Sequence, residues 1–371
     1  MKKLVLVAVP CAAALIVFLI FQSLFPGDSS LLKVWYVEGE FPSSAMESLA
    51  GEYESQRGRD SYELSLRSFS SEEDLAAAFE LERPDLLLCS YTRAASLGSR
   101  DLLGAVELAD RDYLPALEEA LPFAGRSFFP IGAQSPILVY NASLLEQAGI
   151  SPEFESFESF MDLASEYREK SGKPFFSVES LSPLLCSCCA SLGYRLEGEP
   201  EQDGMNKDFA RIYNALASAA MDGSFLPPGE DRLKLAAAGL LPCLVLDRPP
   251  ESALPEGLGY APLPLPQEGA EVYVPQILGF AVTGANSYAL PSVRDFLLWL
   301  QEGFSVEDGL ALGLAPVTQQ AKLAQPGDAL AALLMDSYNN SRALIYPPLG
   351  SFVRNRQAME EQLWGALDLL Y

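Results

Sequence analysis

Short apolar runs alternate with amphipathic segments from residue 31 onward, and this alternation limits the fold more than any other feature of the chain. Residues 32–37 and 86–89 form apolar strands, and residues 62–66 alternate as a third. Between these strands, a capping box at Ser44 predicts the start of a helix that ends before Gly58, and a second helix is predicted over residues 71–82. The order β-α-β-α-β indicates a sheet flanked by helices.

The same pattern restarts in the middle of the chain. Apolar residues at helical spacing predict a helix from Phe157 to the stop signal at Gly172, and residues 249–266 are rich in proline and glycine. The other expected elements are strands at 175–178, 241–246 and 277–283, and helices at 181–192, 208–221 and around 293–300. Two α/β units separated by proline-rich crossings predict two lobes with a ligand cleft between them.

The first 27 residues predict a membrane anchor. Lys2 and Lys3 precede an uncharged run, residues 4–25, which would span roughly 33 Å as a helix at about 1.5 Å per residue. The run is long for a signal peptide and no Ala-x-Ala cleavage site follows it, so an uncleaved signal anchor is expected, with the rest of the chain outside the cytoplasm. Lipidation of Cys11 is the alternative, although Pro10 is unsuited to a lipobox.

Composition excludes several classes of function. The chain of 371 residues carries 50 Asp+Glu against 25 Lys+Arg, a net charge of −25, which would repel nucleic acid. It contains no histidine, so Ser-His-Asp and Cys-His catalysis and imidazole metal sites are absent.

A cysteine cluster occurs at Cys186, Cys188 and Cys189, with Cys89 and Cys243 elsewhere. Zinc sites usually need a second pair of ligands, which this sequence does not supply at the usual spacing. We expect buried thiols on an apolar helix and neither a metal nor a cofactor, and a disulfide stays open as an alternative.

Seven segments follow one another in an order that is informative about the family of this chain. The clearest lies in residues 129–150, where Phe129-Pro-Ile-Gly132 precedes Ser135-Pro-Ile-Leu-Val-Tyr-Asn141 and an Ala-Gly pair. Weaker matches follow at residues 157–160, 237–245, 260–264, 279–282, 296–300 and 313–317. Together these segments resemble the extracellular solute-binding proteins of ABC transporters, in particular the family that binds sugars and oligosaccharides. Ala142 replaces the family's usual lysine, and Asp247 and Arg248 stand where a tryptophan is expected.

After the expected anchor in residues 1–27, this resemblance implies a first lobe of residues 28–133 plus about 260–305 and a second lobe of residues 134–259 plus about 306–371. It also implies a site just past the strand ends. The candidate ligand-binding residues are Glu38, Glu40, Ser90, Tyr91, Arg93, Gln134, Glu179, Asp247, Arg248 and Gln276.

Carboxylates, amides and arginine suit sugar hydroxyls, which both donate and accept hydrogen bonds. Aromatic rings usually complete such sites, and the candidates here are Tyr91, Trp35 and Tyr36, although Trp35 lies inside a strand and is expected in the core. The small number of aromatic candidates favours a mono- or disaccharide over a long oligosaccharide.

The sequence thus predicts the substrate-binding component of an ABC importer, not an enzyme, which captures a small polar solute and passes it to permease subunits. One alternative is an anchored glycoside hydrolase that uses Glu38 and Glu179 as its two carboxylates. Another is a ligand sensor without a transporter. The acidic composition also leaves a cationic ligand such as a polyamine open.

Overall fold

A computed structural model describes most residues from 31 to 304. The chain splits into two compact units, the first made of Met1–Leu88, Gly104–Leu108 and Val282–Leu300, the second of Cys89–Leu103, Ala109–Ala281 and Gln301–Tyr371. Within residues 31–304 the structure leaves out 39, 42, 59–61, 109–112, 114–124, 194–206, 229–230, 249, 251–253, 269–271 and 284–289. After 304 it describes 308, 309, 312, 314, 315, 317, 318, 330, 333, 342, 343, 361 and 365.

None of the helices in these described ranges is both long enough and apolar enough to cross a bilayer. The predicted anchor, residues 4–25, lies outside the described residues.

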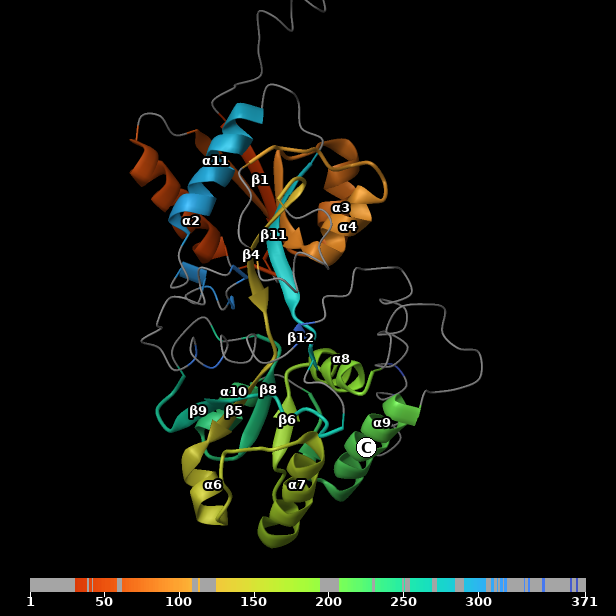
Figure 1. Ribbon diagram of the computed structural model, residues 1–371. Coiled ribbons are helices and arrows are strands. Elements are labelled where there is room, and N and C mark those ends of the chain that lie inside the picture. Colours follow the sequence, from red (N-terminus) through yellow and green to blue (C-terminus); the bar gives the residue numbers. More distant parts are fainter. Residues whose placement is uncertain are drawn as a thin grey trace, which may run out of the picture. The chain divides into compact units, whose positions relative to one another are not determined.

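The first sheet has five strands in the order β2-β1-β3-β11-β4 (Figure 1). β1 pairs in parallel with both β2 and β3, whereas β11 and β4 pair antiparallel. The four predicted strands of this sheet, β1, β2, β3 and β11, are confirmed to within three residues at each end. The bounds are β1 Leu31–Val37, β2 Glu63–Phe69, β3 Leu86–Ser90, β4 Phe128–Gln134 and β11 Gln276–Val282.

β4 was not predicted as a strand because it contains Pro130 and Gly132. It lies at the edge of the sheet, where a proline costs no ladder hydrogen bond to a second neighbour. The register with β11 shifts between Leu278 and Gly279, so that Gly132 opposes Leu278 and Pro130 opposes Gly279. The strand is therefore bulged at this point.

Helices of the first unit pack with the faces that the sequence predicts. In α2 (Ser43–Arg57) the buried residues are Met46, Leu49, Ala50 and Tyr53, although the helix begins one residue before the predicted cap. α3 (Glu72–Leu81) is capped by Ser71, whose side chain accepts from the N–H of Asp74. α11 (Leu290–Gly303) buries Val293, Phe296, Leu297 and Leu300 as expected, together with Trp299.

A polar contact joins α2 to α11, which lie side by side (Figure 1). The Tyr53 hydroxyl donates to Asp295 Oδ2 at 2.8 Å and accepts from the N–H of Tyr62 at 3.3 Å. Burial, more than the hydrogen bond to Asp295, raises the pKa of Tyr53 far above its usual range. The phenol is thus a fixed neutral donor in the core.

The second sheet has the order β7-β6-β8-β5-β9. β6 runs parallel to β7 and β8, and β5 runs antiparallel to β8 and β9. A separate ribbon joins β10 to β12 in parallel. The bounds are β5 Ile137–Asn141, β6 Phe176–Val178, β7 Phe225–Leu226, β8 Cys243–Leu246, β9 Leu258–Ala261, β10 Val272–Tyr273 and β12 Arg342–Ala343.

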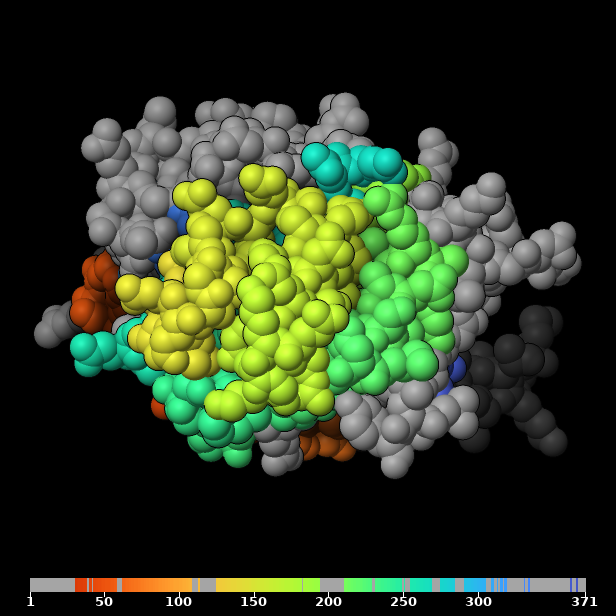
Figure 2. All heavy atoms as spheres, turned by 90° about the horizontal axis from the view of Figure 1, so that it is seen from below, coloured from red at the N-terminus to blue at the C-terminus, as the bar shows by residue number. Residues whose placement is uncertain are grey.

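Helices α6, α7 and α9 lie next to one another on the face of the second unit seen in Figure 2. α7 begins with a capping box between Ser156 and Ser159 and ends at the predicted Gly172, which adopts φ 69°. Its apolar face enters a core built around Phe160, Phe176 and Phe225. The helices of this unit are α4 Tyr91–Gly98, α6 Ala142–Ala148, α7 Phe157–Ser171, α8 Ser182–Ser191, α9 Lys207–Asp222 and α10 Arg232–Ala237.

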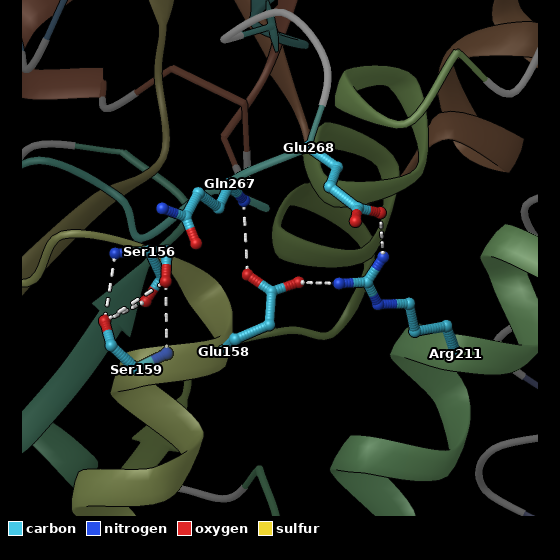
Figure 3. Close-up of polar contacts among 6 residues, drawn as sticks. All are labelled: Ser156, Glu158, Ser159, Arg211, Gln267 and Glu268. Carbon is cyan, nitrogen blue, oxygen red and sulfur yellow. Dashed lines mark hydrogen bonds and ion pairs between the residues drawn. The ribbon is translucent and has the colours of Figure 1, made fainter.

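An ion-pair network ties the start of α7 to α9 and to the segment after β9 (Figure 3). Arg211 lies between two carboxylates, 2.8 Å from Glu158 Oε1 and 2.7 Å from Glu268 Oε2. The second oxygen of Glu158 accepts from the N–H of Gln267 at 3.2 Å. Because all three charged side chains are at least one-third exposed, the network fixes the geometry of these segments more than it adds stability.

α8 is the cysteine-bearing helix, and its cysteine side chains are buried, as predicted. Cys186, Cys188 and Cys189 belong to the apolar core of the second unit together with Cys243 on β8. Burial raises the pKa of the Cys188 and Cys243 thiols well above the usual value. These side chains therefore act as small apolar residues.

Candidate functional site

The carboxyl ends of β6 and β8 bring together three of the predicted site residues. The two strands are parallel, with Val178 opposite Val245, so Glu179 after β6 and Asp247 and Arg248 after β8 reach the same edge of the sheet. The N–H of Glu179 donates to the carbonyl of Val245 at 2.8 Å, which continues the ladder by one step. Glu179 is exposed, whereas Asp247 and Arg248 are half-buried.

Ser180 connects these side chains and forms with them what we call the Glu179–Ser180–Asp247 cluster. The Ser180 hydroxyl donates to Asp247 Oδ2 at 2.6 Å, and its N–H donates to Oδ1 at 3.2 Å. In return, the N–H of Asp247 donates to Glu179 Oε2 at 3.0 Å. The start of α8, two residues after Ser180, adds the positive end of a helix dipole, which favours negative charge nearby.

Gln134 and Gln276 are placed directly opposite each other by the pairing of β4 with β11. Gln134 precedes Ile137 by three residues, and Ile137 pairs with Leu246, the last residue of β8. Gln134 and Gln276 belong to the first sheet, whereas Glu179, Asp247 and Arg248 follow strands of the second. No signal in the sequence paired the two glutamines.

The end of β1 carries the predicted Glu38 and Glu40. Glu38 is exposed, and its Oε1 accepts from the Ser43 hydroxyl at 3.1 Å; Ser43 in turn accepts from the Tyr36 hydroxyl at 3.0 Å. Glu40 is half-buried in the turn after the strand, and its N–H donates to the carbonyl of Val37. The first residue of α2 thus positions one of the two carboxylates.

Ser90, Tyr91 and Arg93 lie at the start of α4, which the sequence analysis did not predict as a helix. Ser90 caps α4, since its side chain accepts from the N–H of Arg93 at 3.4 Å. The Tyr91 ring is only 2% exposed and packs edge-on against Phe128, with 5.4 Å between the ring centroids. In this conformation Ser90 and Tyr91 serve the fold, and Arg93 is half-buried.

None of the three aromatic candidates has an open ring face in this conformation. Trp35 is 2% exposed, as expected for a core residue, and lies 5.1 Å from Phe69 with the Arg67 guanidinium over its ring. Tyr36 is also buried. The described site is therefore composed of polar groups, and its carboxylates accept rather than donate hydrogen bonds.

Ser43 has a clear role at the site but was not among the residues predicted from the sequence. It is the first residue of α2, a few residues after the predicted carboxylates Glu38 and Glu40, and this position is the signal that could have identified it. Among the residues that the structure describes, no group of three or more cysteine or carboxylate ligands is arranged to hold a metal ion.

Comparison with solved structures identifies the fold. The GacH receptor of Streptomyces glaucescens, solved with acarbose, aligns with a TM-score of 0.71 and 16% identity over 91% of this chain and 93% of that one. UgpB from Mycobacterium tuberculosis, in complex with glycerophosphocholine, aligns with a TM-score of 0.69 and 15% identity over 92% and 99%. The spermidine/putrescine ABC transporter substrate-binding protein PotD from Streptococcus pneumoniae aligns with 0.66 and 12% over 91% and 99%.

The chain therefore has the mixed α/β, two-sheet fold of the substrate-binding proteins of ABC transporters, and the resemblance seen in the sequence is confirmed at the level of the fold. No protein-family model matches the sequence, and no curated protein matches it either. The three ligands named above differ in charge, so the fold alone does not determine a ligand class.

Proposed function

We propose that this chain is the extracytoplasmic substrate-binding component of an ABC importer and that it binds a small polar solute, a mono- or oligosaccharide. The observation that carries the proposal is the Glu179–Ser180–Asp247 cluster at the carboxyl ends of β6 and β8, on a fold shared with such receptors. Carboxylates and amides are suited to bind neighbouring hydroxyls. The site contains no group that would need a cofactor.

The proposal includes the two lobes predicted from the sequence, with the ends of β1 and β3 and the ends of β6 and β8 as the two halves of the ligand site. A ligand that contacts both halves would stabilise a closed state over an open one. It also includes an N-terminal anchor in residues 4–25 and delivery of the solute to permease subunits.

A polyamine is the second candidate ligand. The net charge of −25 and the carboxylates Glu38, Glu40, Glu179 and Asp247 at strand ends favour it. Ammonium groups, like hydroxyls, donate hydrogen bonds to carboxylates.

A thermal-shift screen of the full chain in detergent tests these ligand classes. The panel is maltose, maltotriose, acarbose, spermidine and glycerophosphocholine. A ligand at 100 times its dissociation constant adds about 2.7 kcal/mol of stability, which shifts the melting temperature measurably. Stabilisation by a sugar supports the main proposal and stabilisation by spermidine supports the second.

The recovered ligand distinguishes a receptor from a hydrolase. A stabilising sugar that mass spectrometry recovers unchanged after long incubation fits a binding protein, whereas cleaved product identifies Glu38 and Glu179 as candidates for a glycosidase pair. No shift with any member of the panel would count against a transport receptor for these solutes.

A further inference from the structure

Ser180 makes two hydrogen bonds to one carboxylate at the edge of the candidate ligand site. Its hydroxyl and its N–H reach the two different oxygens of Asp247, at 2.6 and 3.2 Å. A carboxylate held through both oxygens cannot rotate about its side-chain torsions without breaking a bond. The 2.6 Å contact has the length of a charge-assisted O–H···O bond.

The same contacts extend the sheet beyond its last backbone pair. After Val178 and Val245, the side chain of Glu179 accepts from the N–H of Asp247, while the side chain of Asp247 accepts from the N–H of Ser180. Each strand end is thus tied to the other by a side-chain carboxylate. Because Ser180 and Asp247 are only half-buried, the bonded groups stay within reach of solvent.

This arrangement determines which hydrogen bonds the Glu179–Ser180–Asp247 cluster can form with a ligand. The carboxylates of Glu179 and Asp247 are acceptors only, and the hydroxyl hydrogen of Ser180 is already donated to Asp247. A ligand group that binds to the Glu179 or Asp247 carboxylate must therefore supply the hydrogen bond donor, as a hydroxyl or an ammonium group does. An anionic group would meet two carboxylates.

We propose that Ser180 is a positioning residue of the ligand site, which holds Asp247 as an acceptor for a donor group of the ligand. The inference rests on the proposed function, because it assumes that Asp247 contacts the solute. Ser180 acts through Asp247 and does not itself need to touch the ligand.

The test is a double-mutant cycle on the full chain, measured by isothermal titration calorimetry with maltotriose and with spermidine. Ser180→Ala is expected to weaken binding about ten-fold, since it removes a hydrogen bond to a charged group. Ser180→Thr keeps the hydroxyl and is expected to restore affinity to within about three-fold of wild type. The variants Asp247→Ala and Ser180→Ala/Asp247→Ala are expected to bind equally weakly, because Ser180 has no side chain left to position once the acceptor oxygens at position 247 are removed.

Ser177→Ala is the matched control. Ser177 lies three residues earlier in the same segment, is fully buried, and its hydroxyl donates to the carbonyl of Leu226 at 2.7 Å, on the side of β7. Its loss removes a comparable hydrogen bond without touching Asp247. Affinity is expected to stay at the wild-type value, even if the melting temperature falls.

The outcomes distinguish a failure of the role proposed for Ser180 from a failure of the proposed function. The role of Ser180 is overturned if Ser180→Ala binds as tightly as wild type, or if the double variant binds more weakly than Asp247→Ala. Either result leaves the proposed function standing. Wild-type chain that binds neither maltotriose nor spermidine overturns the donor-ligand assignment together with the function on which it rests.

Discussion

Replacement of Gly279 by alanine tests the bulged pairing of β4 with β11. A Cβ atom at this position would lie 2.7 Å from Phe128 Cζ and 2.8 Å from the Phe129 carbonyl carbon, and closer still to the Phe129 carbonyl oxygen. Carbon atoms pack best at about 3.5–4.0 Å, so the two strands would have to separate by about 1 Å. The obstacle is backbone, which cannot turn aside as a flexible side chain can.

We therefore expect Gly279→Ala to lower the free energy of unfolding by about 1–3 kcal/mol, the usual cost of overpacking. The assay is urea denaturation followed by far-UV circular dichroism. Gly51→Ala is the control, because Gly51 lies inside α2 with no atom within 4 Å of an added Cβ. Alanine there is expected to raise the free energy of unfolding by about 0.5–1 kcal/mol.

Gly259→Ala provides an intermediate case. Its added Cβ would meet the end of the Tyr140 ring, at 2.6 Å from Cζ and 2.7 Å from the hydroxyl. Since this ring is only half-buried and can move, the expected cost is smaller than at Gly279. Equal stability of Gly279→Ala and wild type, or a larger loss at Gly259, would refute the reasoning from backbone contact.

Three further predictions concern buried polar groups. Burial raises the pKa of Asp85 more than the N–H of Lys33 lowers it, so wild-type stability falls as pH rises through the interval between the unfolded and folded pKa values. Asp85→Asn is expected to remove this fall. Urea titrations between about pH 3 and pH 7 would then show a difference in the free energy of unfolding, variant minus wild type, that grows with pH; a difference that stays constant with pH would contradict it. The five described cysteines are buried and are expected to react with Ellman's reagent only after denaturant is added, so rapid labelling of several thiols in the folded chain would disprove their burial. Tyr53→Phe removes the donor to Asp295 Oδ2, while Arg57 stays 3.5 Å from Oδ1, and is expected to cost about 1.5–3 kcal/mol in denaturant unfolding; an unchanged midpoint would argue against the contact of Tyr53 with Asp295.

Local sequence pattern was sufficient where a strand or helix is regular. The apolar spacing in α2 and α11 gave the buried faces that the structure shows, and Gly172 gave the end of α7. Pattern failed for β4, whose proline and glycine are tolerated only because the strand lies at an edge and is bulged against β11. Tertiary context decided that case.

The candidate site could be predicted only in part for the same reason. The rule that ligands meet the carboxyl ends of parallel strands placed Glu179 and Asp247 correctly at one edge. The rule says nothing about pairs distant in sequence, so the opposition of Gln134 and Gln276 had no local signal. It also treated the segment after β3 as a loop, whereas a helix there draws Tyr91 into the core.

The strand order of the second sheet has a consequence during synthesis. β5, with the sequence Ile-Leu-Val-Tyr-Asn, is made first but occupies an interior position between β8 and β9. Its partners leave the ribosome roughly a hundred residues later, so both of its edges stay unpaired throughout that interval. An apolar strand exposed for so long is a site for wrong association, and a nascent or translocating chain of this kind benefits from a chaperone that covers it until β8 is complete.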